Sequence, residues 1–452
     1  MNNTTSTKDK LKTVLLEWHR FNIPIVIERN FKSSIVDENR IVSIIGPRRA
    51  GKTWACYQLI RYLIDRKVPR ENILLINFED ERLAPLDGSE LTWLLEAHAE
   101  LFNEQAGIKR YCFLDEIQNV PNWSKWVRRV SELHQDLTII LTGSSSKLLS
   151  TEIATELRGR TRSTTILPYS FGEFYSACDT HGFSIKTIGY GKERTKATRI
   201  FNDYLERGGF PAITGLTTYS IQLQEYYRTM FARDMIERFS IRHIKLFEDF
   251  LKLQLTRFAS LSSISRLERE LKTFGHSCNK NTLTHYFDHA RDTFLLSDVP
   301  ALHSKIKAQM VLPHKVYAVD HGLVRAIRFS MTEDRGRYLE NIVFMELKRN
   351  YDTIFYHPGG PRAQECDFII MEKTRVIAAI QTCWSMERIE TRDREIKGLL
   401  MALESYKLKE GLILTADDSG ETTVEGKRII IKPVWLWALE SFASKNGPVG
   451  GR

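Results

Sequence analysis

One stretch decides the fold of this chain, and it reads Gly46-Pro47-Arg48-Arg49-Ala50-Gly51-Lys52-Thr53. The apolar residues 41–45 come before it, and a helical pattern that begins at Trp54 comes after it. A buried strand, a glycine loop and a helix, in this order, are what a phosphate-binding P-loop requires. Glycines let successive backbone N–H groups point at phosphate oxygens, which the positive end of the helix dipole also faces. The stretch therefore predicts a site for a nucleoside triphosphate.

The end of this loop carries the side chains that a triphosphate needs. Lys52 is placed to reach the β- and γ-phosphates, and Thr53 is placed to offer its hydroxyl to Mg²⁺. We therefore expect ATP and Mg²⁺ as cofactors. The predicted nucleotide-binding residues form one run: Gly46, Pro47, Arg48, Arg49, Ala50, Gly51, Lys52, Thr53 and Trp54.

Three further strand signals follow along the chain. They cover residues 73–78, 111–114 and 137–141, and polar residues follow each of them directly. Strands that alternate with helical stretches are typical of a parallel α/β sheet, whose ligands lie beyond the carboxyl ends of its strands. The fold class predicted for this part is a P-loop NTPase core.

The polar residues after these strands complete the predicted site. Asp115 and Glu116 follow the second of the three strands as a Walker B motif would. Asp115 would hold Mg²⁺, and Glu116 would orient or deprotonate the attacking water. An Asp-Glu pair at a strand end is by itself more often solvated, but its place after a P-loop favours catalysis. Ser144, or Thr142 beside it, is positioned to sense the γ-phosphate.

Two arginines further on, Arg158 and Arg160, flank a glycine. They could belong to a solvated helix end. An NTPase of this layout, however, needs an arginine to neutralise transition-state charge, often from a neighbouring subunit. We favour Arg160 over Arg158 for this role. An arginine given to a neighbour implies a homo-oligomer, either a ring or an ATP-dependent assembly.

Composition indicates a globular protein with room for about three domains, since the chain has 452 residues, 42% hydrophobic and 27% charged. The formal net charge of +9 leans weakly toward an anionic partner such as nucleic acid. The six dispersed cysteines form no CxxC pair, which favours a reducing interior over a disulfide framework. The polar N-terminus and the charged residues within 11–27 argue against a signal peptide or a membrane span. We expect a cytoplasmic protein without membrane association.

Several motifs together resemble one known family. They are the P-loop and the stretches 114–123, 142–145, 157–160, 168–174, 208–211 and 233–236. Their sequences resemble archaeal and bacterial AAA+-type ATPases that carry a DUF4143 C-terminal region, and the resemblance covers about residues 20–440. It implies an AAA+/STAND-like core, a winged-helix segment and a restriction-endonuclease-like fold at the C-terminus.

The middle of the chain divides into two helical segments. Residues 181–245 read as helical and stand where a lid over the nucleotide belongs in this class. Residues 246–305 hold two short amphipathic helices in a helix-turn-helix layout. The helix after Asn279 would present Lys280, Asn281, Thr284 and His285 outward. This segment could contact DNA or serve only as a packing element.

The C-terminal part resembles the PD-(D/E)XK nuclease fold in its order of helix, strand, hairpin and strand. In that fold carboxylates hold Mg²⁺ and a lysine positions water. Glu340 and Asp367 match two of the acids, but Gln381-Thr382-Cys383 stands in the Glu-x-Lys slot. Gln381 could still offer an uncharged oxygen to a metal. Since one carboxylate and the lysine are missing, we expect a fold kept for binding or assembly rather than for cleavage.

These expectations give one domain order and two leading functions. The predicted parts are an ATPase core at 1–180, a lid at 181–245, a winged helix at 246–305, a nuclease-like domain at 306–440 and a tail at 441–452. The favoured function is an ATP-hydrolysing, DNA-associated motor or remodeller. The alternative is a STAND-like nucleotide-dependent switch or assembly factor that acts on a protein partner. A dead scaffold is disfavoured because Lys52, Thr53, Asp115 and Glu116 are all present.

Overall fold

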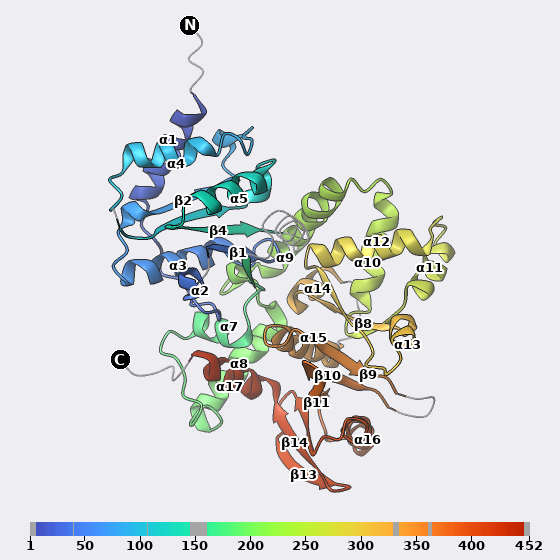
Figure 1. The fold of residues 1–452 in the computed structure, drawn as a ribbon. Helices are drawn as coiled ribbons and strands as arrows, with labels where there is room; N and C mark the ends of the chain where they lie inside the picture. Colours follow the sequence, from blue (N-terminus) through green and yellow to red (C-terminus); the bar gives the residue numbers. More distant parts are fainter. Residues whose placement is uncertain are drawn as a thin grey trace. The chain divides into compact units, whose positions relative to one another are not determined.

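The computed structural model describes residues 6–38, 40–105, 107–144, 161–328, 334–359 and 364–446 (Figure 1). The chain forms two compact units, Met1–Leu167 and Pro168–Arg452. The predicted arginines 158 and 160 and the end of the tail, residues 447–452, lie outside the described residues.

The first unit is built on a five-stranded parallel sheet, which confirms the α/β expectation. Its strands lie in the order β2-β3-β4-β1-β5, and each pair of neighbours is parallel. The strands are β1 Ile41–Ile45, β2 Ile73–Asn77, β3 Arg110–Asp115, β4 Leu137–Gly143 and β5 Thr161–Thr165. The four predicted strands are among them. The fifth, β5, is a polar edge strand without the apolar run that predicts a strand.

Helices cover both faces of this sheet. They are α1 Thr7–Arg20, α2 Ile35–Glu38, α3 Lys52–Asp65, α4 Thr92–Leu101 and α5 Trp123–Leu133. Neighbouring residues of a strand enter different cores, because side chains alternate across a sheet. Ile139 packs with residues of α1, α4 and α5, whereas Ile140 packs with residues of α2 and α3. A sheet that is buried on both faces leaves its strand ends as the place for polar residues.

The second unit begins with helices. They are α7 Phe171–Cys178, α8 Gly191–Arg207, α9 Tyr219–Thr229 and α10 Ile244–Thr256, with a π-helical segment Met230–Glu237 after α9. The start of α7 has a capping box, in which the Ser170 hydroxyl accepts from the Glu173 N–H and the Glu173 carboxylate accepts from the Ser170 N–H. The glycine turn after α8 is held by Asp320, whose carboxylate accepts the Gly209 N–H at 2.7 Å.

The next part combines helices with a small sheet. Helices α11 Ile264–Thr273 and α12 Lys280–Asp292 are followed by strands β7 Leu296–Val299 and β8 His314–Ala318, with α13 Ile306–Val311 between them. Strand β8 pairs antiparallel with β7 and with β6 Ser260–Ser262. In α12 the inward residues Leu283, Tyr286 and Ala290 are buried. The predicted outward residues Lys280, Asn281, Thr284 and His285 are exposed.

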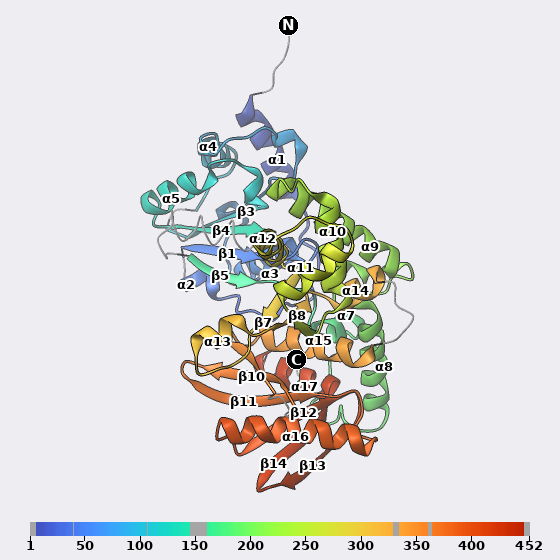
Figure 2. The ribbon, with the colours of Figure 1, turned by 90° about the vertical axis from the view of Figure 1, so that its right-hand side faces the viewer.

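The last part is a six-stranded mixed sheet in the order β13-β14-β12-β11-β10-β9. Its strands are β9 Ile354–His357, β10 Cys366–Glu372, β11 Arg375–Thr382, β12 Glu410–Thr415, β13 Gly420–Val424 and β14 Lys427–Pro433. Its helices are α14 His321–Ile327, α15 Arg335–Lys348, α16 Ile389–Ser405 and α17 Val434–Asn446. Figure 2 shows α16 on one face of this sheet and α15 and α17 on the other. Within the described residues, no helix is both long and apolar enough to cross a bilayer.

The close approach of α14 to the end of α8 gives a stability prediction. A Cβ atom at Gly322 would lie 1.9 Å from the Arg207 carbonyl oxygen, whereas a Cβ at Gly336 would meet no heavy atom within 4 Å. Gly322→Ala should therefore lower the free energy of unfolding by about 1–3 kcal/mol, because the backbone must move apart. Gly336→Ala is the matched helical control and should not destabilise the protein. Equal urea midpoints for the two variants would contradict this packing.

Candidate functional site

The P-loop joins β1 to α3 and depends on glycine at both ends. A Cβ atom at Gly46 would lie 2.0 Å from the Ile166 carbonyl oxygen, so only glycine fits against the end of β5. Gly51 has φ 96° and ψ 33°, a left-handed conformation that favours glycine, and it precedes the first turn of α3. The loop therefore leads the chain directly to the helix N-terminus, where backbone N–H groups are available to an anion.

Lys52 lies buried at the start of α3 and faces the Walker B acid. Its Nζ is 3.1 Å from Glu116 Oε1 and 3.4 Å from the Pro47 carbonyl oxygen. Burial raises the pKa of Glu116, but the Lys52 ammonium lowers it, and the resulting pKa lies below its ordinary value. Glu116 is therefore held as a carboxylate at neutral pH.

Asp115 lies at the centre of a network of hydroxyl groups. The Thr53 hydroxyl donates to Asp115 Oδ2 at 2.7 Å, and the Thr142 hydroxyl donates to Asp115 Oδ1. The Thr142 oxygen in turn accepts the Glu116 N–H at 2.8 Å. Burial and then the nearby Glu116 charge raise the pKa of Asp115. These contacts bring together α3, β3 and β4, as expected for strand ends that share one edge of a sheet.

Glu116 is held by its backbone and by a neighbour. Its φ is 53°, a left-handed conformation that is uncommon for a residue with a side chain. The Gln118 side-chain amide donates to Glu116 Oε2 at 2.5 Å. The positioning role of Gln118 was not predicted, although the Asp-Glu-Ile-Gln run contains it. Ser144, the other predicted sensor, is buried beyond the end of β4.

Among the remaining predicted loop residues, Pro47 and Ala50 are buried, whereas Arg48, Arg49 and Trp54 are at least partly exposed. The Arg48 guanidinium pairs with Glu79 Oε1 at 2.8 Å, which links the loop to the residues after β2. Arg49 has a positive φ of 66°. Trp54 is 48% exposed and meets the Tyr57 ring edge-on at 5.9 Å. An exposed aromatic ring beside the loop is available to a nucleotide base.

Arg29 is a buried residue of this region that sequence reasoning missed. Its guanidinium donates to the Ala50 carbonyl oxygen of the loop at 2.7 Å and to the carbonyl oxygen of Leu167. Its backbone N–H donates to Gln58 Oε1 on α3 at 2.7 Å. No motif marks Arg29, because its main partners are backbone oxygens. It braces the loop by linking Ala50 to Leu167.

The residues present fit a magnesium-bound triphosphate. Mg²⁺ prefers hard oxygen ligands, and it usually takes one or two protein carboxylates together with phosphate oxygens. The Thr53 hydroxyl and the Asp115 carboxylate supply such oxygens side by side. Lys52 and the N-terminus of α3 supply positive charge next to them.

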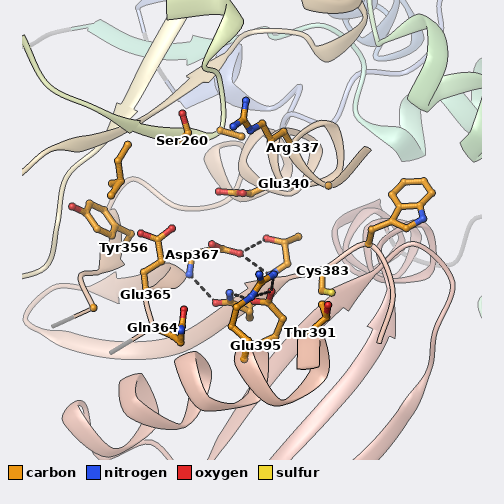
Figure 3. Close-up of a pocket in the computed structure, with 18 of the residues that line it drawn as sticks. Ser260, Arg337, Glu340, Tyr356, Gln364, Glu365, Asp367, Cys383, Thr391 and Glu395 are labelled. Atoms are coloured by element: carbon orange, nitrogen blue, oxygen red, sulfur yellow. Dashed lines mark hydrogen bonds and ion pairs between the residues drawn. The ribbon is translucent and has the colours of Figure 1, made fainter. Parts of the chain in front are cut away.

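A second site lies in the C-terminal part as a cavity of about 1380 Å³. Figure 3 shows its side chains, with Arg337 and Glu340 from α15, Glu365 and Asp367 at the start of β10, and Glu395 from α16. Lys315 from β8 reaches three of these acids. Its Nζ lies 2.6 Å from Asp367 Oδ1, 3.0 Å from Glu365 Oε1 and 3.1 Å from Glu340 Oε1.

The other predicted residues of this centre bind one another. Gln381 Oε1 accepts the Asp367 N–H at 3.0 Å, and Gln381 Nε2 donates to Glu395 Oε2 at 2.5 Å. The Thr382 N–H and hydroxyl both donate to Asp367 Oδ2 at 2.8 Å. Burial raises the pKa of Cys383 to about 11, so it is a neutral thiol at neutral pH. The Glu-x-Lys slot therefore supplies no cation here.

Lys315 supplies the cation instead, and it was not predicted. Burial lowers the pKa of Lys315, but the charges of Asp367 and Glu340 outweigh burial. The resulting pKa is well above the ordinary lysine value. Burial and the Asp367 charge raise the pKa of Glu340 to about 7. The sequence signal for Lys315 is its position in β8. Residues two apart in a strand share a face, and Tyr317, two residues after Lys315, also donates to Glu340 Oε1.

Metal binding at this centre stays a prediction. Glu340 and Asp367 each contact the Lys315 ammonium, which lies between them. Across the described residues, no group of three or more histidine, cysteine or acidic side chains is arranged to hold a metal ion. The cation that the structure places among these acids is an ammonium group.

Comparisons with known proteins identify an AAA domain in the first part of the chain. Residues 38–175 match a family described as an AAA domain, and residues 198–334 match DUF8612, a domain of unknown function, rather than DUF4143. The chain is 34% identical over 427 residues to the uncharacterized protein MJ1544 of Methanocaldococcus jannaschii, which covers 92% of this chain and 91% of that protein. An uncharacterized protein of Haemophilus influenzae is 26% identical over 407 residues, covering 88% of this chain and 95% of that protein.

Solved structures with some similarity include two archaeal proteins. The Walker-type ATPase PABY2304 of Pyrococcus abyssi has a TM-score of 0.42 and 12% identity, covering 73% of this chain and 96% of that chain. The Aeropyrum pernix ORC1 protein, solved in complex with DNA, has a TM-score of 0.29 and 11% identity, covering 72% and 92%.

The brace formed by Arg29 gives a prediction for the nucleotide site. Arg29→Ala leaves the buried carbonyl oxygens of Ala50 and Leu167 without their donor, so unfolding should need about 3 kcal/mol less free energy. The loop should also lose its shape, which weakens nucleotide binding. Arg40→Ala removes an exposed guanidinium from the same unit and serves as the control. Urea unfolding and nucleotide titration measure the two effects. Wild-type behaviour of Arg29→Ala would show that the brace is dispensable.

Proposed function

We propose that this chain, which belongs to the same family as the uncharacterized protein MJ1544 of Methanocaldococcus jannaschii and carries an AAA domain, binds and hydrolyses ATP and acts on DNA. One observation carries the proposal of hydrolysis. At one edge of the parallel sheet, Thr53 contacts Asp115 while Lys52 contacts Glu116. The residues proposed to bind phosphate, Mg²⁺ and water therefore lie side by side.

Each of these residues has a distinct role in the proposed reaction. The loop amides and Lys52 bind the β- and γ-phosphates. When phosphate binds, the Lys52 ammonium leaves Glu116 and contacts the phosphate oxygens. The freed Glu116 carboxylate orients water and accepts its proton, with Gln118 holding the carboxylate in place. Thr53 and Asp115 would hold Mg²⁺, which when bound offsets phosphate charge. Thr142 fixes Asp115 and is, with Ser144, a candidate sensor of the γ-phosphate.

The proposed transition state also needs an arginine. Arg160, with Arg158 second, stays our candidate for an arginine supplied to a neighbouring subunit, and this makes the working form a homo-oligomer. We keep the helical segment 181–245 as the proposed lid.

Two features support DNA as the partner. The segment 246–305 is proposed as a winged helix, because α11 and α12 precede antiparallel strands and α12 exposes Lys280, Asn281, Thr284 and His285. The formal net charge of +9 favours an anionic partner. The region 306–440 is proposed as a nuclease-like domain that no longer cuts, since Gln381 and Cys383 replace the Glu-x-Lys pair.

One observation favours a second function. The Gln381 side chain is used up in contacts with Asp367 and Glu395, so the C-terminal centre is organised for rigidity rather than for hydrolysis. A STAND-like switch, in which ATP orders an assembly with a protein partner, needs no DNA. ATP turnover that DNA stimulates supports the motor, whereas slow turnover indifferent to DNA supports the switch.

Two substitutions separate nucleotide binding from hydrolysis. Lys52→Ala should weaken ATP binding by about 10–100-fold, because charge-assisted hydrogen bonds to phosphate are lost. Glu116→Gln should keep binding but lower kcat by about 10²–10⁴-fold, because the general base is lost. Calorimetry and phosphate release measure the two effects. Asp65→Asn removes an exposed carboxylate from the end of α3 and is the control. Unchanged turnover by Glu116→Gln would remove this residue from the mechanism.

The exposed face of α12 is tested by charge reversal. Lys280→Glu should weaken duplex DNA binding and lower the slope of log affinity against log salt by about 1, because one phosphate contact is lost. Arg392→Glu changes the charge equally on an exposed position of α16 and is the control. Fluorescence anisotropy over a range of salt concentrations measures both variants. Identical slopes would exclude α12 from the DNA interface.

A further inference from the structure

The lining of the C-terminal cavity contains a group of arginines, which we call the rim, and a group of acids, which we call the floor. Its rim includes five arginines from four parts of the second unit: Arg257, Arg266, Arg337, Arg388 and Arg394. Its floor includes Glu340, Glu365 and Asp367, on which Lys315 converges. A cavity of about 1380 Å³ above this floor has room for a segment of an extended chain.

The rim arginines differ in how far they are already engaged. Arg257 and Arg266 both pair with Glu270, and Arg394 pairs with Glu395. Within the described residues Arg337 has one ion pair, a long contact of 3.5 Å with Asp334, and both side chains are partly exposed. Arg388 is exposed and has no ion pair within the described part of the chain. Arg337 and Arg388 are therefore the two rim cations most available to a ligand.

Two arginines at the mouth of a cavity suit phosphate oxygens, because a guanidinium presents several donors in a planar fork. The acids of the floor would repel such a ligand if nothing neutralised them. In metal-dependent phosphodiester enzymes divalent cations play that part. Here the Lys315 ammonium lies within 3.1 Å of an oxygen of each of the three carboxylates. Its position among them matches that of a bound cation.

We propose that this cavity binds a DNA phosphodiester backbone through Arg337 and Arg388, with the Lys315 ammonium taking the place of a divalent metal at the floor. The proposal rests on DNA as the partner in the proposed function. It adds a second contact region besides α12, and it makes binding independent of metal. It also accounts for the proposed loss of cleavage. The buried ammonium of Lys315 is held by three carboxylates, so neither it nor these acids are available to activate water.

The rim is tested by DNA binding without nucleotide and with EDTA. Wild-type protein should bind a fluorescent duplex under these conditions. Arg337→Glu and Arg388→Glu should each weaken binding about tenfold, because a charge-assisted contact to phosphate is lost. Arg392→Glu, one turn along α16 from Arg388 and outside the cavity lining, is the matched control and should bind as wild type. Equal affinities of all three variants would overturn the proposal.

The floor is tested by replacing the internal cation. Lys315→Met should lose DNA affinity in EDTA, because three carboxylates then face the phosphates without a counter-charge. Mn²⁺ should restore binding to this variant and should not strengthen binding by the wild type. The double variant Lys315→Met, Asp367→Asn should not be restored. Wild-type affinity that requires Mn²⁺, or a Lys315→Met variant that binds normally in EDTA, would overturn the role of Lys315.

The outcomes separate this inference from the proposed function. The assay contains no nucleotide, so it does not depend on ATP hydrolysis. Wild-type protein that binds no DNA would remove both this site and the DNA partner and leave the ATPase intact. Wild-type protein that binds DNA equally well with Arg337→Glu and Arg388→Glu would remove this site alone. Thermal melting checks that each variant is folded, and the rim variants test the site even where loss of Lys315 unfolds the domain.

Discussion

The hydrogen bonds that join Thr53, Asp115 and Thr142 are the constraint on which the first unit depends. They connect the first turn of α3 to the carboxyl ends of β3 and β4. The buried ion pair between Lys52 and Glu116 lies at the same edge of the sheet. Since these charges lie away from solvent, water screens them little, and moving either partner changes the state of the other. This arrangement couples the positions of Lys52 and Glu116, which we propose to bind phosphate and to activate water.

Local signals explain what the sequence could predict in this unit. Strands β1 to β4 carry apolar runs that are followed by polar residues, and the glycine loop follows the first of them. The structure has these elements in the expected order. Strand β5 escaped prediction because Thr161–Thr165 is polar and is placed only by its pairing with β1. Arg29 escaped because its guanidinium donates to the backbone oxygens of Ala50 and Leu167, which no residue pattern records.

The C-terminal part shows the same limit at a longer range. The order of helix and strands was expected, and Glu340 and Asp367 both contact Lys315. Lys315 comes from β8, outside the segment where a nuclease lysine was sought. Any strand that passes the site can supply a cation. The missing lysine at residue 383 therefore does not show that the centre lacks a cation. Only the tertiary fold reveals the donor.

The guanidinium of Arg29 has a mechanical consequence for the whole chain. It holds the Ala50 and Leu167 carbonyl oxygens at once, and Leu167 is the last residue before the second unit begins at Pro168. A shift of the loop when its ligand changes would pull on this guanidinium and so on the peptide that leaves the first unit. A displacement of the loop at Ala50 would thus reach the covalent junction between the two units through a single side chain.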